Sequence, residues 1–260
     1  MEKELITIGL EALRRGAAVV KSSCGRATGI THKGKLDLVT DADRRAEEAV
    51  VSFLQQATPQ CGVLAEERNE ITGNSTARWI LDPLDGTTNF AHGYPFFCVS
   101  LAFEQSGRIE WGAVLDPLRD ELFSACRGRG AHCNSAPVRV SDTAQLDQAM
   151  LCTGFPYDVH DSDADNLDHF ARIIKKARAI RRDGAAALDL CYVAAGRFDG
   201  FWEMKLKPWD MAAGVLIVQE AGGRVSGFDG RDLCLDSGTV LATNGRLHDA
   251  LVDLLSCRRS

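Results

Sequence analysis

Residues 79–90 read Trp-Ile-Leu-Asp-Pro-Leu-Asp-Gly-Thr-Thr-Asn-Phe, and this stretch decides how the chain is interpreted. An apolar strand is predicted to deliver Asp82 at its end, where a proline turns the chain and Asp85 follows three residues later. Gly86 then allows a close backbone approach, and Thr87 adds a hydroxyl and an amide. Taken alone, the pattern also fits a plain surface turn, because Asp, Pro and Gly are turn residues. The rest of the chain argues against that alternative.

Further carboxylates occur in similar settings. Glu66 and Glu67 close the apolar run 61–65. Asp43 and Asp210 each fall near the start of a predicted helix, where an acid is ordinarily just a partner of the helix dipole. Buried carboxylates repel each other by roughly 1 kcal/mol per pair at about 4 Å in water, and several times more near a protein surface. Divalent cations relieve this repulsion and all-oxygen ligands select hard ions, so the carboxylates together predict a magnesium site.

These parts combine into one reaction, the hydrolysis of a phosphate monoester. Such esters hydrolyse so slowly that enzymes accelerate them by up to about 10²¹-fold. Two metal ions can activate water, neutralise the phosphate dianion and stabilise the leaving oxygen. The backbone amides of Gly86 and Thr87 would hold the phosphate oxygens. The residues therefore favour a metal-dependent phosphatase.

Helices and strands are predicted to alternate along the chain. Apolar periodicity predicts helices near the N-terminus, at about 41–57, 184–195 and 208–221, and at the end of the chain. Strands are predicted at 61–65, 79–81, 96–103, 109–115, 121–125, 178–181, 201–204 and 240–243. Hairpins and crossovers are mixed, which indicates a layered α/β fold, an α+β sandwich. The 260 residues suit a single domain over 1–260, with possible subdomains at about 1–145 and 146–260.

Composition and charge exclude several classes of protein. The formal net charge of −6 does not favour broad nucleic-acid binding, which usually needs a basic face. Nine cysteines without a C-x-x-C pair predict buried thiols in a reducing cytosol, in preference to disulfides or zinc. Charges at Glu11, Arg14 and Arg15 interrupt the first apolar stretch, and no apolar run is long enough to span a membrane. We therefore expect a cytoplasmic protein.

Five segments resemble the motifs of the inositol monophosphatase family in order and spacing, and the similarity covers nearly the whole chain. They are DLVTDAD at 37–43, AEE at 65–67, WILDPLDGTTNF at 79–90, GAAALDL at 184–190 and KPWDMAAG at 207–214. The resemblance implies alternating helix and sheet layers, as in inositol monophosphatases and fructose-1,6-bisphosphatases. It also implies a homodimer, activation by two or three Mg²⁺ per active site with Mn²⁺ as a possible substitute, and inhibition by Li⁺.

Transferred position by position, the resemblance assigns roles to individual residues. The implied metal ligands are the carboxylates of Glu66, Asp82, Asp85 and Asp210 and the carbonyl of Leu84, with Asp82 bridging two metals. The implied catalytic residues are Thr87, Asp43 and Glu66, of which the first two resemble the family's water-activating pair. Gly86 and Thr87 would hold the phosphate. The implied substrate contacts are Asp85, Gly184, Ala185, Ala186, Glu203 and Asp210.

The chain departs from the family pattern at two places. Ala185 stands where relatives often carry Ser or Thr, so one side-chain hydrogen bond to the substrate is lost. The loop before Asp37 normally offers a lysine near the metals. The candidates here are His32, Lys33 and Lys35, of which Lys33 is favoured, against the alternative of a solvated surface charge. Glu67 is either a group that orients the metal ligands or only a polar neighbour.

The leading hypothesis is a phosphatase that acts on inositol 1-phosphate by direct attack of water. A fructose-1,6-bisphosphatase or a dual-specificity sugar phosphatase is the alternative within the superfamily. Nucleotide substrates are disfavoured, because DGTTNF replaces the DGTKGF style of the nucleotide-specific members. An alternative from another class is a regulatory relative that binds a partner in the transcription machinery, although no basic stripe supports contact with RNA.

Overall fold

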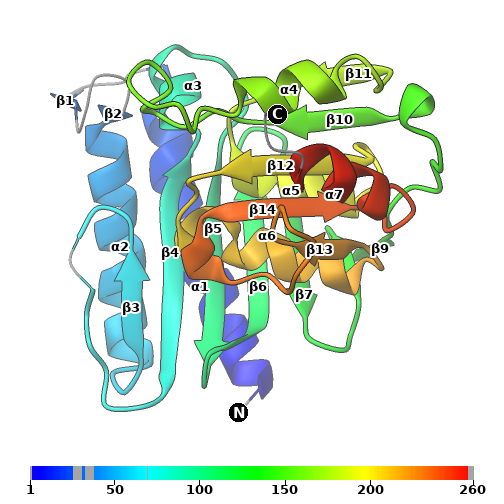
Figure 1. Cartoon of the computed structure of the whole chain (residues 1–260). Helices are drawn as coiled ribbons and strands as arrows, with labels where there is room; N and C mark the ends of the chain where they lie inside the picture. Colours follow the sequence, from blue (N-terminus) through cyan, green and yellow to red (C-terminus); the bar gives the residue numbers. More distant parts are fainter. Residues whose placement is uncertain (1, 26–30, 33–37, 69, 257–260) are drawn as a thin grey trace.

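The first half of the chain forms a seven-stranded sheet covered on one face by two long helices. The computed structural model describes residues 2–25, 31–32, 38–68 and 70–256 (Figure 1). The sheet has the order β3-β4-β5-β6-β7-β8-β9, with parallel β3 and β4 and antiparallel neighbours beyond. Its strands are β3 (Gly62–Ala65), β4 (Ala77–Asp85), β5 (Cys98–Gln105), β6 (Arg108–Asp116), β7 (Glu121–Cys126), β8 (Ala131–Cys133) and β9 (Ala136–Val138). The covering helices are α1 (Glu2–Ser23) and α2 (Asp41–Ala57), preceded by the short pair β1 (Thr31–His32) and β2 (Leu38–Val39).

Side chains of β4 are buried on both faces of this sheet. Trp79 and Leu81 pack with residues of α1 and α2, whereas Ile80 packs in a second core on the opposite face. Successive side chains of a strand point to opposite faces, so a strand that is apolar at every position needs cover on both sides. The sheet is therefore an inner layer of the molecule.

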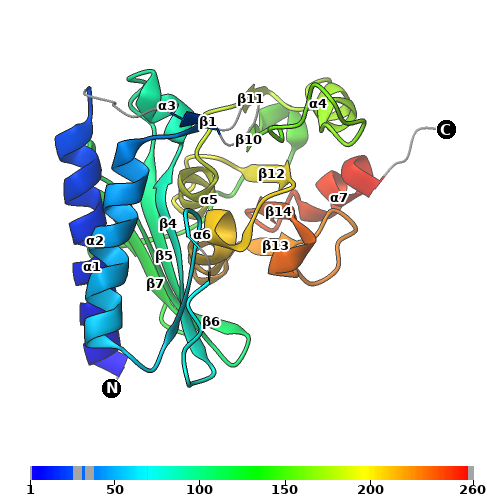
Figure 2. The same ribbon diagram turned by 90° about the vertical axis from the view of Figure 1, so that its left-hand side faces the viewer.

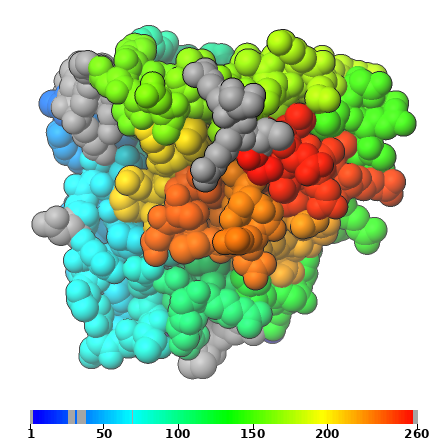
Figure 3. All heavy atoms as spheres, viewed as in Figure 1, coloured from blue at the N-terminus to red at the C-terminus, as the bar shows by residue number. Residues whose placement is uncertain are grey.

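The second half of the chain builds a smaller sheet of five strands, in the order β11-β10-β12-β14-β13. Its strands are β10 (Met150–Thr153), β11 (Ala179–Arg181), β12 (Gly200–Met204), β13 (Arg224–Ser226) and β14 (Thr239–Thr243). The helices of this half are α4 (Leu167–Ile173), α5 (Ala186–Ala194), α6 (Pro208–Glu220) and α7 (His248–Ser256), with single 3₁₀ turns at Leu146–Gln148 and Leu235–Ser237. In the space-filling view, the orange and red segments of this half occupy the middle and right of the face turned to the viewer, beside the cyan segments of the first half (Figure 3).

Helices α5 and α6 lie between the two sheets (Figure 2). Ten of the thirteen positions of α6, including Val215 and Ile217, are apolar or glycine, and a helix that is apolar all round is buried. The layer order is α1 and α2, the seven-stranded sheet, α5 and α6, the five-stranded sheet, then α4 and α7 (Figure 2). This alternation confirms the predicted layered α/β sandwich.

The elements largely match the predicted ranges, and α2 coincides with its prediction. One expectation is wrong: Asp82 does not mark the end of its strand, because β4 runs on through Pro83 to Asp85. The short strands β8, β9, β10 and β13, and the helices α4 and α3 (Thr87–Ala91), were not predicted. No helix within the described residues is long and apolar enough to cross a membrane.

Candidate active site

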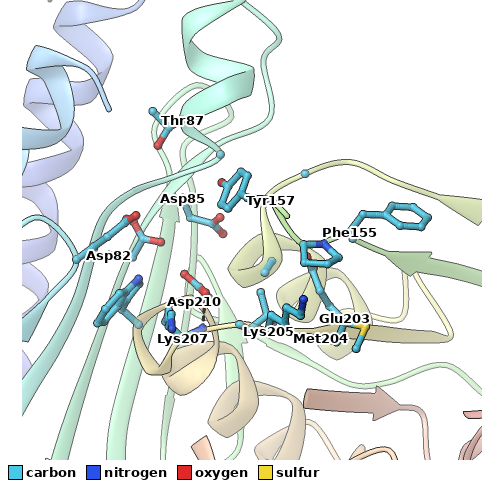
Figure 4. A pocket seen from close by; sticks show the side chains of 18 of the residues that line it. Asp82, Asp85, Thr87, Phe155, Tyr157, Glu203, Met204, Lys205, Lys207 and Asp210 are labelled. Carbon is cyan, nitrogen blue, oxygen red and sulfur yellow. Dashed lines mark hydrogen bonds between the residues drawn. The ribbon is translucent and has the colours of Figure 1, made fainter. Parts of the chain in front are cut away.

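A cavity of about 420 Å³ opens where β4, α3, β12 and the start of α6 converge, beside the loop 154–158. Figure 4 shows Asp82, Asp85 and Asp210 around one space, with Thr87 nearby. Of the predicted residues, the following line the cavity: Glu66, Asp82, Leu84, Asp85, Gly86, Thr87, Gly184, Ala186, Glu203 and Asp210. Residues that lie up to 144 positions apart in the sequence thus meet in one place.

A bulge in β4 places two of these carboxylates on the same face of the sheet. Asp82 pairs with Ser100 on β5 and Asp85 pairs with Cys98, so three steps on β4 oppose two steps on β5. Regular alternation would send residues three apart to opposite faces, and the extra residue of a bulge corrects this. Proline is tolerated at a bulge because it has no N–H to donate to the sheet. The Asp-Pro-Leu-Asp spacing therefore brings both carboxylates to one cavity.

The other two carboxylates arrive from neighbouring elements. β3 runs parallel to β4 with Ala65 opposite Leu81, so Glu66, the next residue, lies beside Asp82. Asp210 lies in the first turn of α6, where its Oδ2 accepts a hydrogen bond of 2.7 Å from the backbone N–H of Lys207. Asp210 therefore lies where a carboxylate interacts favourably with the helix dipole, as the sequence suggested, and it also lines the cavity.

Burial and the repulsion between neighbouring carboxylates raise the pKa values of Asp82 and Asp85. Burial raises the pKa of Asp82 well above its ordinary value, and the charges of Glu66, Asp85 and Asp210 add to the effect. Burial and the charge of Asp210 raise the pKa of Asp85 to about 7, against the hydrogen bond from the backbone N–H of Ala187. The described side chains therefore leave an excess of negative charge at the cavity.

Two protein hydrogen bonds fix one oxygen of Asp85. Its Oδ2 accepts the backbone N–H of Ala187 at 2.7 Å and lies 3.7 Å from the Sγ donor of Cys98. Similarly, Oδ1 of Asp82 accepts the backbone N–H of Leu84 at 2.9 Å. Backbone N–H groups thus hold each carboxylate in one orientation at the cavity.

Thr87 and Asp43 form a buried hydrogen-bonded pair at the edge of the cavity. The Thr87 hydroxyl lies 2.9 Å from Oδ1 of Asp43 and 3.0 Å from the carbonyl oxygen of Leu84. Thr40 anchors the other oxygen of Asp43 with its backbone N–H at 2.8 Å and its hydroxyl at 2.5 Å. Asp43 is fully buried and does not line the cavity, and burial raises its pKa in spite of these hydrogen bonds. Its effect on the cavity is therefore transmitted through Thr87.

Glu203 enters the cavity from β12 and lies against Gly154. A Cβ added to Gly154 would come within 2.0 Å of Oε1 of Glu203, so only glycine leaves room for this carboxylate. Burial raises the pKa of Glu203 to about 8, and the charges of Asp210 and Asp85 add to this effect. Arg182, which also lines the cavity, acts in the opposite direction.

The loop segments on either side of the cavity pack tightly. Gly86 has φ of +92°, and a Cβ there would lie 3.0 Å from the carbonyl oxygen of Phe96. Ala185 is buried and does not line the cavity; its Cβ faces Gly86 instead. Asn89 donates hydrogen bonds to the carbonyls of Phe96 and Asp183 at 2.7 and 2.8 Å, which ties these two loops together.

Several residues of the cavity wall were not predicted. Arg182, Lys205 and Lys207 bring positive charge to it, and the Nζ of Lys205 lies 2.6 Å from a carboxylate oxygen of Asp158. The remaining unpredicted wall comes from Gly154, Phe155, Pro156, Tyr157, Asp158, Met204, Leu206 and Trp209. One signal was present in the sequence: residues 204–207 lie between Glu203 and Asp210, two predicted site residues.

Glu67 is held at the end of β3 by helix α2. Its backbone N–H donates a hydrogen bond of 2.8 Å to Glu47, whose other oxygen accepts the Arg68 guanidinium at 2.7 Å. Glu47 lies one helical turn after Asp43, so the same face of α2 supports both Thr87 and the segment that carries Glu66. Lys33 lies outside the described residues.

The oxygen ligands at the cavity fit a hard divalent cation. Four carboxylates and the Leu84 carbonyl converge there, and a cation would neutralise the mutual repulsion that, together with burial, raises the pKa values of Asp82 and Asp85. Sulfur and nitrogen ligands are absent from the predicted metal-binding residues, which favours magnesium or manganese over zinc or copper.

Comparison with known proteins agrees with this chemistry. The family model described as the inositol monophosphatase family matches residues 1–260. The chain is 45% identical over 257 residues to the Nus factor SuhB of Pseudomonas aeruginosa, covering 95% of this chain and 94% of that protein. It is 43% identical over 253 residues to the inositol-1-monophosphatase of Synechocystis sp., covering 96% and 88%. The crystal structure of the extragenic suppressor protein suhB from Bartonella henselae is similar with a TM-score of 0.91 and 40% identity, over 97% of this chain and 98% of that chain.

Proposed function

Because this chain belongs to the inositol monophosphatase family, a family of metal-dependent phosphatases, we propose that it hydrolyses inositol 1-phosphate and related myo-inositol monophosphates to inositol and phosphate. One observation carries the proposal: four carboxylates and the Thr87–Asp43 pair meet at one cavity. That combination supplies both the cation ligands and the water-orienting group that hydrolysis of a phosphate monoester needs.

The proposed cation is Mg²⁺, two or three per site, with Mn²⁺ as a substitute. The residues that would hold the ions are Glu66, Asp82, Asp85, Asp210 and the Leu84 carbonyl. Bound there, the ions would lower the pKa of a water, neutralise the phosphate dianion and stabilise the leaving oxygen.

The residues of the chain orient the attacking water and the phosphate. Thr87 donates its single hydroxyl proton to Asp43, so its oxygen is free to accept a hydrogen bond from water, which Glu66 also helps to hold. Asp43, fixed by Thr40, keeps this orientation because both of its oxygens are occupied. The backbone N–H groups of Gly86 and Thr87 hold the phosphate oxygens.

The ring hydroxyls of inositol are assigned to the opposite wall of the cavity. Glu203 accepts hydrogen bonds from ring hydroxyls, while Asp85, Asp210, Gly184 and Ala186 complete the contacts. Ala185, which lies outside the cavity lining, offers no side-chain hydrogen bond, so Glu203 carries more of the discrimination than in relatives with a hydroxyl there.

A substrate panel tests the proposed specificity. The values of kcat/KM should be highest for inositol 1-phosphate and lower for fructose 1,6-bisphosphate and 3′-phosphoadenosine compounds. A higher value for fructose 1,6-bisphosphate would replace the proposed substrate with a sugar bisphosphate.

Single-turnover hydrolysis in ¹⁸O-labelled water tests direct attack: the label should enter the released phosphate in the first turnover. Label found in the protein would instead indicate a covalent intermediate.

We further propose a cytoplasmic homodimer that is inhibited by lithium. Sedimentation should give twice the chain mass of 28.2 kDa. Li⁺ should lower kcat at saturating Mg²⁺. A monomer would contradict the proposed homodimer, and an enzyme that resists lithium would contradict the proposed inhibition.

The name Nus factor SuhB, borne by a relative at 45% identity, favours regulatory binding as a second candidate function. In that case this chain would bind a partner in the transcription machinery through its surface. Asp85→Asn separates the two functions, because it removes a proposed metal ligand inside the cavity. A variant without phosphatase activity that still complements a deletion strain would make binding the main function, and loss of both would favour catalysis.

A further inference from the structure

A second cluster of metal-binding groups lies behind the wall of the cavity. Sγ of Cys152 and one carboxylate oxygen each of Asp183 and Asp189 all lie within 4.8 Å of one another. None of the three belongs to the predicted catalytic residues, and none lines the cavity. The cluster therefore needs an explanation of its own.

Three different elements bring these groups together. Cys152 lies in β10, the second strand of the five-stranded sheet, opposite Arg181 of β11 and Phe201 of β12. Asp183 lies in the turn between β11 and α5, and Asp189 lies one turn inside α5. Cys152 and Asp189 are buried and Asp183 is half-buried, so the fold brings groups from three separate segments together.

Asp189 has unused ligand capacity inside this cluster. Its residue is 1% exposed, and its Oδ1 has no hydrogen-bond partner among the residues that the structure describes. The Cys152 thiol donates to the same carboxylate. An unpaired buried carboxylate oxygen costs free energy, so such atoms usually have a partner in the functional protein.

The chemistry of the three groups selects a borderline cation. A thiolate favours zinc over magnesium, and carboxylates also bind zinc. In a tetrahedral zinc site the sulfur and oxygen ligands are about 3.6 Å apart, given Zn–S of about 2.3 Å and Zn–O of about 2.1 Å. A separation of at most 4.8 Å needs only small side-chain rotations to reach this geometry.

Electrostatics point in the same direction. Burial raises the pKa of Asp189 well above its ordinary value, and the charges of Asp183, Glu203 and Asp85 add to this. Burial also raises the pKa of the Cys152 thiol. A divalent cation would stabilise both ionised forms, so its binding releases the protons these groups carry.

We propose that Cys152, Asp183 and Asp189 bind a Zn²⁺ ion, with water as the fourth ligand, at a site separate from the catalytic cavity. Asp183 is half-buried and gives the ion a route from the surface. It also lies between Arg182 and Gly184, which both line the cavity. An occupied site therefore tethers the substrate-side loop to the strand β10.

Cobalt substitution tests the site by a signal that the catalytic carboxylates cannot give. Co²⁺ added to the full-length protein in excess Mg²⁺ should produce a thiolate-to-cobalt charge-transfer band in the near ultraviolet. Cys152→Ala should abolish this band. Cys98→Ala is the matched control, because the Cys98 thiol lies beside Asp85 at the cavity; it should keep the band. A band lost in Cys98→Ala instead, or no band in the parent protein, would overturn the proposal.

Zinc binding supplies the second measurement. Competition with a chromophoric chelator in excess Mg²⁺ should give one high-affinity Zn²⁺ per chain. Asp183→Asn should raise the Kd at least tenfold, and an unchanged circular dichroism spectrum would show that the variant is folded. Equal zinc affinity in the parent protein, Asp183→Asn and Cys152→Ala would place the ion elsewhere and refute the site.

Discussion

Replacing Glu203 with glutamine should lower kcat/KM for inositol 1-phosphate by about tenfold to a hundredfold, and should hardly change that for p-nitrophenyl phosphate. The carboxylate lines the cavity and lies against Gly154, and burial and the charges of Asp210 and Asp85 raise its pKa. A charge-assisted hydrogen bond contributes about 1.5–3 kcal/mol. Since about 1.4 kcal/mol is a factor of ten, the loss of the charge and of one acceptor gives the range stated. The aryl ester has no ring hydroxyls, so it should not sense the change.

The assay compares both substrates at saturating Mg²⁺, with two companion variants. Gly154→Ala should reproduce the selective loss, because its Cβ would come within 2.0 Å of Oε1 and displace the carboxylate. Glu110→Gln, on β6 and outside the cavity, is the matched control and should change neither substrate. Equal losses on both substrates would assign Glu203 to the metal site or to folding. No loss on either substrate would leave Glu203 with a packing role. Either result would refute the reasoning.

Three further predictions concern the catalytic pair and the carboxylates. Thr87→Val should lower kcat by about 10²–10⁴-fold, because Asp43 can then no longer orient water through the hydroxyl, whereas Thr87→Ser should retain most activity in steady-state assays. Asp82→Asn should be nearly inactive but folded, and calorimetry should show a smaller Mg²⁺-induced rise in Tm; an unchanged rise would contradict its role as a ligand. In the metal-free protein, the pKa of Asp85 is about 7 and that of Glu203 about 8, above their ordinary values of 3.8 and 4.5, so the folded state holds more protons than the unfolded state. Tm without metal should therefore fall as the pH rises from about 4 to about 8, and Mg²⁺ should remove most of this slope; a Tm that rises with pH would show that these groups do not govern stability.

Local signals in the sequence were sufficient for most of the fold. α2 was predicted at its observed ends because its apolar residues recur at helical spacing and Pro59 follows its last turn; the structure adds that Thr40 caps its start. The end of β4 was misjudged because Pro83 usually interrupts a strand, and only the pairing with β5 creates the bulge that accommodates it. Short strands such as β8 and β13 have three residues each, too few for a periodic pattern.

Some residues of the site could be predicted from a local motif, whereas others matter only through contacts with residues far away in the sequence. Asp82 and Asp85 were visible because turn residues and carboxylates stand together in one motif. Gly154 was not, because its importance arises from contact with Glu203, which is 49 positions away and on a different strand. Lys205 was missed for a related reason: its ion pair with Asp158 joins two loops that only the sheet brings together.

The position of α6 between the two sheets has a consequence for splitting the protein. This helix contacts β4, β5, β6, β7 and β8 of one sheet and β13 and β14 of the other, and it comes from the second half of the chain. A polypeptide cut between Ala144 and Gln145, both exposed, would leave the seven-stranded sheet without cover on one face. The complementary piece would expose the apolar surface of α6 in turn. Two such fragments should therefore aggregate or stay unfolded separately and regain structure only when mixed, which makes this chain a candidate for fragment complementation in which assembly itself restores the catalytic cavity.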